Sequence, residues 1–425
     1  SRVPDLDVYR EGIVKMSGEV PMHPPSDASL DRRAFMQRLM AASALVAGAG
    51  AIAASPAAAS PRSRPVLDVY ADDLPDSSVD LIDLTIAQAA VLLRRGTITP
   101  VELVERHLAR IAEFDSTYLA WNTVLAESAL ERARRLQRSS TRHALFGIPI
   151  AVKDNYFTQG VRTTANSFIY QDFVPTFDAT VVTRLQQAGG IVLGKTQMGP
   201  LATTRATTPD GIVTTVNAWT PNDPAVYPGG SSTGSATAVA GRMATSSIGT
   251  QTGGSITNPA LAQGLTGLKP TMGRCSLFGV IPLTYTRDHP GPIARDIKDA
   301  AIMLQSMAGP DEHDARTLGL PEVPDLVAAA TPVRRGKETV CRWPTRLGVF
   351  PDYLSGTGAA TGLRRAMLDS MSGLGIRIVT IEPPDEWGTL SGYAFNSVRL
   401  PERSEAFLEY LRSDLKLFGV SLTTW

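Results

Sequence analysis

Two glycine- and serine-rich turns lie close together in the chain, PGGSSTGS at residues 228–235 and TQTGGSITNPA at residues 250–260, and no histidine or acidic residue separates them. A serine hydroxyl becomes a good nucleophile only when a neighbouring base removes its proton, and a neutral lysine is one of the groups that can do so. The two turns therefore predict serine chemistry with a base other than histidine.

Lys153 is the candidate base, because it lies near the end of the apolar segment FGIPIAVKDN at residues 146–155, which is typical of a short buried strand. An ordinary lysine, with a pKa of about 10.4, is almost entirely charged at pH 7. Burial lowers a lysine pKa by up to about 3–5 units, and a decrease of about three units would suffice to make the amine a base near pH 7. Such a base acts directly or through a second serine that relays the proton. The structural alternative is a lysine that snorkels to the surface or forms an ion pair.

The segment TGGS at residues 252–255 is predicted to form an oxyanion hole, because its two glycines allow successive N–H groups to point at one oxygen. Such donors typically contribute about 3 kcal/mol each to the transition state. The alternative is an ordinary turn. Asn258 and Pro259 are predicted to be the cap and the first residue of a short helix that ends near Gly264.

Two other motifs suggest competing chemistry. GGIVLGKT at residues 189–196 matches the phosphate-loop pattern, but a helix precedes it and its middle is typical of a strand, so no nucleotide site is expected. GSSTG at residues 230–234 matches the nucleophile elbow of α/β-hydrolases, which would make Ser232 the nucleophile and His289 or His313 its base. An elbow follows a hydrophobic strand, whereas residues 222–228 are typical of a turn. The esterase alternative rests on chain order alone.

The composition excludes several classes of partner. The 425 residues include 41 basic and 41 acidic side chains, so no overall field attracts nucleic acid or an anionic membrane. A small neutral partner is expected instead. Cys275 and Cys341 have no metal-type spacing with the five histidines, so no metal site is expected. Both are interpreted as buried thiols, and whether they pair is left open.

The first part of the chain is interpreted as a leader at residues 1–59 and a linker at residues 60–79. Arg32 and Arg33 precede an apolar run at residues 39–54, and three alanines at residues 57–59 offer a cleavage site, a set that resembles a twin-arginine export signal. The run is too short and too rich in alanine for a transmembrane helix. We expect a periplasmic or secreted protein without stable membrane insertion, or a cytoplasmic one if this segment is only a disordered arm.

Helix and strand signals alternate over most of residues 80–425, which are interpreted as one α/β domain. Capping boxes predict helices at residues 85–96 and 99–111, and a helix at residues 180–188 leads into an apolar strand. Ligands of such sheets bind at the carboxyl ends of the strands. Lys153 is expected to lie at that edge.

Taken together, the longest motifs resemble the amidase signature family. They are GIPIAVKDN (147–155), DATVVTRL (178–185), GGIVLGKT (189–196), GGSSTGSATAVAG (229–241), GTQTGGSITNPA (249–260), GLKPTMGRCSLFGVIPL (267–283) and DHPGPIARDIKDAA (288–301). The resemblance covers residues 80 to about 410. It implies a single α/β domain with a large mixed β-sheet flanked by α-helices on both sides, and hydrolysis of a carboxylic amide without a metal or cofactor.

The resemblance also implies the roles of individual residues. Ser255 matches the nucleophile, Ser231 the proton relay that follows a cis peptide bond, and Lys153 the base. The oxyanion hole matches the backbone of Thr252, Gly253, Gly254 and Ser255. Residues that support this site match Gly229, Gly230, Ser232 and Gln251.

Two departures from the family pattern bear on the substrate and on the chain itself. Gln251 and Thr257 stand where members commonly carry aspartate and arginine. Joint loss of a charge pair favours a neutral or apolar acyl group in a small-molecule or peptidic amide. Members usually continue past Trp425, so the C-terminal part is expected to be missing. Three alternative functions are left open: a glutaminase similar to the A-type component of an amidotransferase, the esterase, and an inactive relative of the family. Whether the protein forms a homodimer is also left open.

Overall fold

The computed structural model describes residues 74–391 except positions 77 and 142, together with short stretches at residues 397–398, 401–403, 405, 416–417 and 420–421. The predicted leader at residues 1–59 and most of the linker at residues 60–79 lie outside this part. Within it, no helix is long and apolar enough to cross a membrane.

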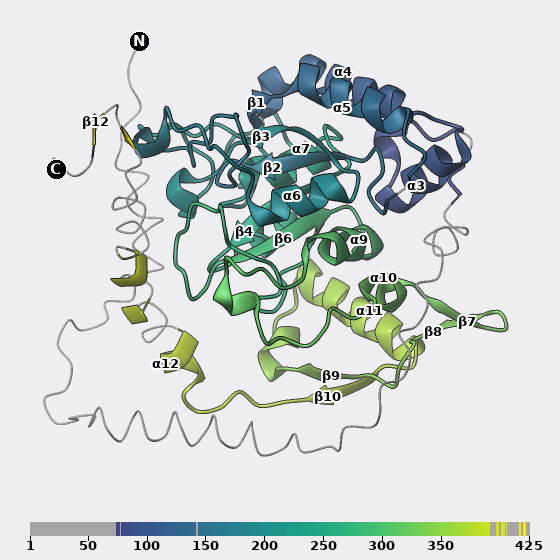
Figure 1. Cartoon of the computed structure of the whole chain (residues 1–425). Coiled ribbons are helices and arrows are strands. Elements are labelled where there is room, and N and C mark those ends of the chain that lie inside the picture. The colour runs from purple at the N-terminus through teal and green to yellow at the C-terminus, as the bar shows by residue number, and fades with distance from the viewer. Residues whose placement is uncertain are drawn as a thin grey trace, which may run out of the picture. The chain divides into compact units, whose positions relative to one another are not determined.

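A six-stranded sheet forms the centre of the described structure (Figure 1). Its strands are β1 (Trp121–Val124), β2 (Pro149–Lys153), β3 (Ile191–Thr196), β4 (Ser246–Gln251), β5 (Thr266–Gly267) and β6 (His289–Ala294), in the order β1-β3-β2-β4-β6-β5. The three central strands β3, β2 and β4 are parallel, and the outer pairings are antiparallel. The predicted mixed sheet is confirmed.

Helices flank this sheet, as predicted. They are η2 (Leu81–Asp83), α3 (Ile86–Arg95), α4 (Pro100–Tyr118), α5 (Ala126–Gln137), η3 (Phe168–Tyr170), α6 (Thr180–Gln187), η4 (Pro200–Ala202), α7 (Thr233–Ala240), α8 (Thr257–Ala262), α9 (Ile297–Met307), η5 (Ala315–Thr317), α10 (Leu326–Ala330), η6 (Pro351–Leu354), α11 (Ala359–Gly373) and α12 (Trp387–Ser391). Figure 1 shows α4 and α5 near the β1 end of the sheet and α9 beside β6.

Beyond α10 the described strands form three separate two-stranded sheets. They pair β7 (Val333–Arg335) with β8 (Glu338–Val340), β9 (Arg346–Val349) with β10 (Arg377–Thr380), and β11 (Lys416–Leu417) with β12 (Val420–Ser421). Only the β9 and β10 pair is parallel. The alternation of helix and strand therefore continues to about residue 380, but these later strands do not extend the central sheet.

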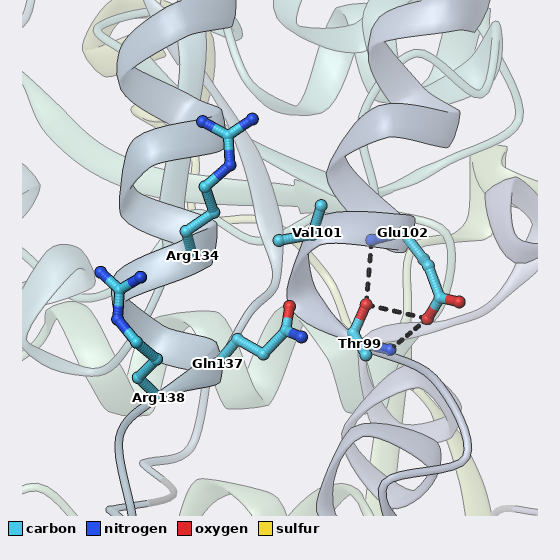
Figure 2. Close-up of a pocket in the computed structure, with 6 residues that line it drawn as sticks. All are labelled: Thr99, Val101, Glu102, Arg134, Gln137 and Arg138. Atoms are coloured by element: carbon cyan, nitrogen blue, oxygen red, sulfur yellow. Dashed lines mark hydrogen bonds between the residues drawn. The ribbon is translucent and has the colours of Figure 1, made fainter.

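Local sequence signals explain where the first helices begin. The Thr99 hydroxyl accepts a hydrogen bond from the Glu102 amide, and the Glu102 carboxylate accepts one from the Thr99 amide, so α4 starts with the predicted capping box (Figure 2). The helix α3 starts with a second box, and Gly96, with φ +71°, ends it. Arg134 of α5 lies across a shallow hollow from α4.

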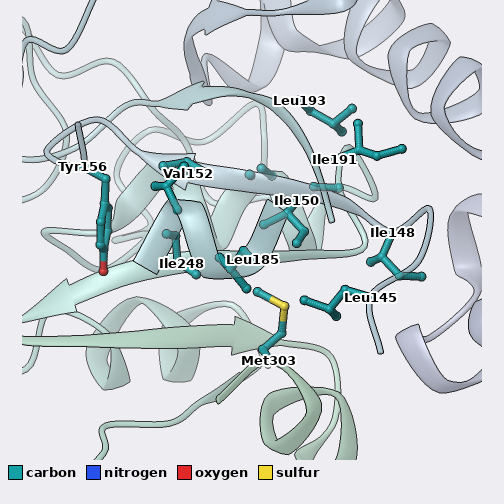
Figure 3. Close-up of a cluster of buried hydrophobic side chains, with 14 of the residues drawn as sticks. Leu145, Ile148, Ile150, Val152, Tyr156, Leu185, Ile191, Leu193, Ile248 and Met303 are labelled. Carbon is teal, nitrogen blue, oxygen red and sulfur yellow. The ribbon is translucent and has the colours of Figure 1, made fainter. Parts of the chain in front are cut away.

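The core explains why β2 can carry a buried polar residue. Ile150 and Val152 of β2 pack with Leu185 of α6 and Met303 of α9, and all four side chains are fully buried (Figure 3). Side chains alternate between the two faces of a strand. Lys153 is therefore directed to the other face, where α7 packs against the central strands.

The two cysteines are not bonded to each other. Cys275 is buried, and burial raises the pKa of its thiol to about 12. Cys341 is only half-buried, so its interpretation as a buried thiol was wrong. It lies between the short strands that follow α10, where the central core no longer covers the chain.

Candidate active site

Lys153 ends β2 at the carboxyl edge of the parallel strands, and its side chain is fully buried. Its Nζ atom lies 2.9 Å from the Ser231 Oγ, 2.8 Å from the Thr250 Oγ1 and 3.3 Å from the Thr250 carbonyl oxygen. Within the described residues no carboxylate forms a salt bridge with it. The surface or ion-paired lysine of the structural alternative is therefore not what the fold contains.

The environment of Lys153 favours its neutral form. Burial lowers the pKa of Lys153 to about 7, although the charge of Asp288 opposes this change. A neutral amine carries two N–H groups and one lone pair, and a carbonyl oxygen can only accept. If both N–H groups go to Thr250, the lone pair is left facing the Ser231 hydroxyl. This arrangement suits a base that takes a proton from Ser231.

A second buried lysine, Lys195 of β3, has the opposite arrangement. Its Nζ atom lies 3.2 Å from the Asp154 Oδ1 and donates to the Tyr156 carbonyl oxygen and the Thr163 Oγ1, both at 2.7 Å. Residues 191–196 of the phosphate-loop match form a strand, as predicted, so their amides belong to the sheet. Lys195 is thus a structural cation, and the motif around it does not form a phosphate loop.

The two serine turns pack directly against each other. Ser231 follows a cis peptide bond from Gly230, as the family resemblance implied. The Gly230 amide donates to the Asn258 Oδ1 at 3.2 Å, which joins the first turn to the second. At Gly229, with φ +80°, an added Cβ would lie 2.2 Å from the Pro259 Cα. A side chain at position 229 would therefore push the turns apart.

Ser255 lies in the second turn and lines a cavity of about 490 Å³. Its carbonyl oxygen accepts from the Ser232 amide at 3.2 Å, a further bond between the turns. Gly253 and Gly254 line the same cavity, and Gly254 has φ +127°, a conformation that favours glycine. In the described part of the chain, no backbone carbonyl accepts from the amides of Gly253, Gly254 or Ser255. These three donors are available to a ligand.

The helix that follows Ser255 differs from the prediction. It begins at Thr257, so Asn258 is not its cap and Pro259 is not its first residue. The reason is Gln251, whose Oε1 accepts from the Ile256 and Thr257 amides, both at 2.9 Å, and from the Thr257 hydroxyl at 3.1 Å. A side chain from β4 thus replaces the local cap, and the two positions that depart from the family pattern are hydrogen-bonded to each other.

The residues of the esterase alternative do not come together. Ser232 is fully buried, and its hydroxyl donates to the Thr250 carbonyl oxygen at 3.3 Å. The His289 Nδ1 lies 3.3 Å and 2.5 Å from the carbonyl oxygens of residues 251 and 287. His313 stacks on Phe278 with 4.5 Å between ring centroids. Neither histidine contacts Ser232.

Sequence reasoning missed three side chains around this site. Thr250 holds the amine of Lys153, and Asn155 donates to the Thr250 Oγ1 at 3.0 Å. Asp288 accepts a hydrogen bond from the Thr252 hydroxyl. Thr250 and Asp288 both lie inside the quoted motifs, but only the pairing of the strands brings Thr250 to Lys153 and Asp288 to Thr252.

The described residues contain no group of three or more histidine, cysteine, aspartate or glutamate side chains arranged to hold a metal ion.

A sequence profile of the family described as Amidase matches residues 102–402. The chain belongs to this family, whose members hydrolyse amides, and it has the α/β fold of the family, with a mixed central sheet.

Proteins similar to this chain include amidotransferase components and a peptide amidase. The A-type component of the glutamyl-tRNA(Gln) amidotransferase of Geobacter sulfurreducens is 36% identical over 347 residues, which are 80% of this chain and 68% of that protein. The component of the same name from Roseiflexus is 43% identical over 279 residues, or 64% and 54% of the two chains. The peptide amidase of Stenotrophomonas maltophilia superposes with a TM-score of 0.69 at 30% identity, covering 78% of this chain and 68% of that one.

Proposed function

We propose that the protein hydrolyses a carboxylic amide through an acyl-enzyme on Ser255, with Ser231 as proton relay and Lys153 as base. The observation that carries this proposal is the buried Lys153 amine, 2.9 Å from the Ser231 hydroxyl and without an ion-pair partner in the described residues. A lysine in that setting is a base near neutral pH, because burial lowers its pKa to about 7.

The mechanism follows from the order of these groups. Lys153 takes the Ser231 proton while Ser231 takes that of Ser255, and the Ser255 Oγ adds to the substrate carbonyl carbon. The carbonyl oxygen becomes an oxyanion that accepts from the free amides of the turn at residues 252–255. Ser231 then passes a proton to the leaving nitrogen and recovers one from the Lys153 ammonium, the carbon–nitrogen bond breaks, and the acyl group remains on Ser255. Water adds by the same route and releases the acid.

The cavity supports an uncharged substrate. All nine residues that line it are uncharged, and they include Tyr227 and Leu261. Gln251 and Thr257, which form a neutral hydrogen-bonded pair, add no charge beside the nucleophile. A carboxylate or ammonium group in this cavity would lose water without gaining a counter-ion. We infer a neutral or apolar acyl group in a small-molecule or peptidic amide, and the likeness to a peptide amidase agrees with this.

The second candidate is a glutaminase like the amidotransferase relatives, favoured by their 36% and 43% identity. The paired arginines at residues 32–33 favour the exported amidase, because folded proteins leave the cytoplasm through such signals. We further propose that the protein acts in the periplasm or outside the cell. Ammonia release from glutamine, compared with that from a panel of peptide amides and small amides, distinguishes the two substrates.

The triad is tested by labelling the protein with a fluorophosphonate and locating the modified residue by mass spectrometry. The proposal expects label on Ser255, no label after Lys153→Ala, and full labelling after His289→Ala or His313→Ala. Ser232→Ala serves as the matched control, because it removes a buried hydroxyl from the same turn. Label on Ser232, or undiminished label without Lys153, contradicts the proposal, and an unlabelled protein supports the inactive relative.

A further inference from the structure

Asp288 lies beside the site without belonging to the triad. Its side chain is buried just before β6, and three donors converge on it. One carboxylate oxygen accepts from the Thr252 hydroxyl, and the other accepts from the amides of Leu283 and Thr284 at 2.7 and 3.0 Å. Burial raises the pKa of Asp288, while these three donors and Lys153 stabilise its ionised form.

The contact with Thr252 fixes one end of the oxyanion turn. Thr252 begins the turn, and Asp288 ties it to the loop at residues 283–288. Gln251 fixes the other end, because it accepts from the amides of Ile256 and Thr257. Between these two anchors, the amides of Gly253, Gly254 and Ser255 donate to no backbone carbonyl oxygen of the described residues. Loss of either anchor would let the turn relax away from a bound oxyanion.

The charge of Asp288 also raises the pKa of Lys153, against the larger effect of burial. The elements packed around Lys153 contribute few titratable groups: β4 and α7 contain none, and β3 contributes Lys195, which is paired with Asp154. The buried Tyr156 donates its hydroxyl to the carbonyl oxygen of residue 249. The next residue, His289 of β6, is buried, and its Nε2 lies 3.3 Å from the Lys269 Nζ.

We propose that Asp288 is a positioning residue of the catalytic apparatus: its carboxylate, fixed by the amides of Leu283 and Thr284, holds the oxyanion turn through the Thr252 hydroxyl. This inference rests on the proposed function. A purely structural aspartate would anchor the loop at residues 283–288 and do nothing to the base. The contact with the turn and the charge of Asp288 predict different effects on reactivity. The oxyanion turn sets the maximal rate of the reaction, and the charge of Asp288 sets the pH at which Lys153 becomes neutral.

The test measures the second-order rate constant for fluorophosphonate labelling of Ser255 in the full chain, from about pH 5 to about pH 10. Labelling is a suitable readout because it needs the base and the oxyanion hole but no knowledge of the substrate. Four variants are compared with the wild type: Asp288→Asn, Thr252→Val, Thr252→Ser and Asp299→Asn. Asp299 is the matched control, a buried carboxylate that accepts from the amides of residues 86 and 87, away from Lys153.

Asp288→Asn removes the charge that favours the ammonium form of Lys153. The acid limb of the profile is therefore expected to move down by about one pH unit, the lower end of what an opposite charge produces. The plateau is expected to fall about tenfold, because the turn loses an anchor but keeps its donors. Thr252→Val keeps the charge, so only the plateau falls. Thr252→Ser restores the plateau, and Asp299→Asn changes neither feature.

The inference is overturned if the acid limb of Asp288→Asn stays at the wild-type pH or moves up, or if Thr252→Val leaves the plateau unchanged. Should Asp288→Asn fail to fold, as judged by circular dichroism, the Thr252→Val loss and its rescue by Thr252→Ser decide the anchoring role. Failure of the proposed function itself has a different signature, because Ser255 of the wild type would then not be labelled at any pH.

Discussion

The pH dependence of nucleophile activation is the most direct consequence of the buried amine. Lys153 has a pKa of about 7, so its neutral fraction is about 9% at pH 6, about 50% at pH 7 and about 91% at pH 8. Only the neutral amine can take the proton of Ser231. The labelling rate of Ser255 is therefore expected to rise about tenfold between pH 6 and pH 8 and then to level off.

The assay follows fluorophosphonate incorporation over time by intact-protein mass spectrometry, with reagent in excess and buffers of constant ionic strength. The reagent has no group that titrates in this range, so the profile reports the free enzyme. Lys153→Arg is the matched control, because a guanidinium keeps the positive charge at every pH tested and has no lone pair to offer. This variant is expected to remain unlabelled across the whole range.

An acid limb centred above about pH 9 would refute the reasoning, since that is where an ordinary lysine loses its proton. A profile that is flat between pH 6 and pH 8 would refute it as well, because it would mean that the group activating Ser255 does not titrate there. Labelling of Lys153→Arg at the wild-type rate would remove Lys153 from the mechanism altogether.

Three other predictions concern the cost of burying Lys153, the hydrogen bond from its amine to Thr250, and the cap of α8. Because the pKa of Lys153 falls from 10.5 in the unfolded chain to about 7, its burial disfavours folding by about 4 kcal/mol at pH 7. The Lys153→Met variant is therefore expected to have a free energy of unfolding about 2 kcal/mol higher than that of the wild type at pH 7, after the lost hydrogen bonds are counted. In urea unfolding, this gain should vanish as the pH approaches 10.5. A variant that is less stable than the wild type at pH 7 contradicts the prediction. Thr250→Val removes the 2.8 Å partner of the amine, so labelling should slow about tenfold, whereas Thr250→Ser should retain the wild-type rate. Gln251→Ala uncaps α8 and should lower the free energy of unfolding by about 1 kcal/mol, with unchanged stability as the refuting result.

Local sequence patterns predicted the parts of the site that depend on local rules. The apolar segment ending at Lys153 predicted a short buried strand with the candidate base at its end, and the structure contains both, although the pattern left a surface or ion-paired lysine open. Unusual backbone was predicted for both glycines of the TGGS turn, and Gly254 has positive φ whereas Gly253 does not. The starts of α3 and α4 followed from capping residues that lie within four positions of each other in sequence.

The remaining contacts depend on the pairing of strands that are distant in the chain. Thr250 meets Lys153 because β2 and β4 pair in parallel across 97 residues of sequence separation, and no local pattern specifies that partner. Asp288 reaches Thr252 because β4 and β6 pair antiparallel, with residue 251 opposite residue 289. The cap of α8 was misassigned for a different reason. Asn258 satisfies the usual capping rule, but the Gln251 side chain, five and six residues before Ile256 and Thr257, accepts from their amides instead.

The contacts between the two serine turns limit how this enzyme can evolve. Asn258 faces the cavity and also binds the backbone of residue 230, so a change there that suits a new substrate disturbs the relay at the same time. Leu261 lines the same cavity one helical turn further on, and its side chain is 81% exposed. Lineages that acquire new substrates are therefore expected to vary position 261 early and position 258 rarely.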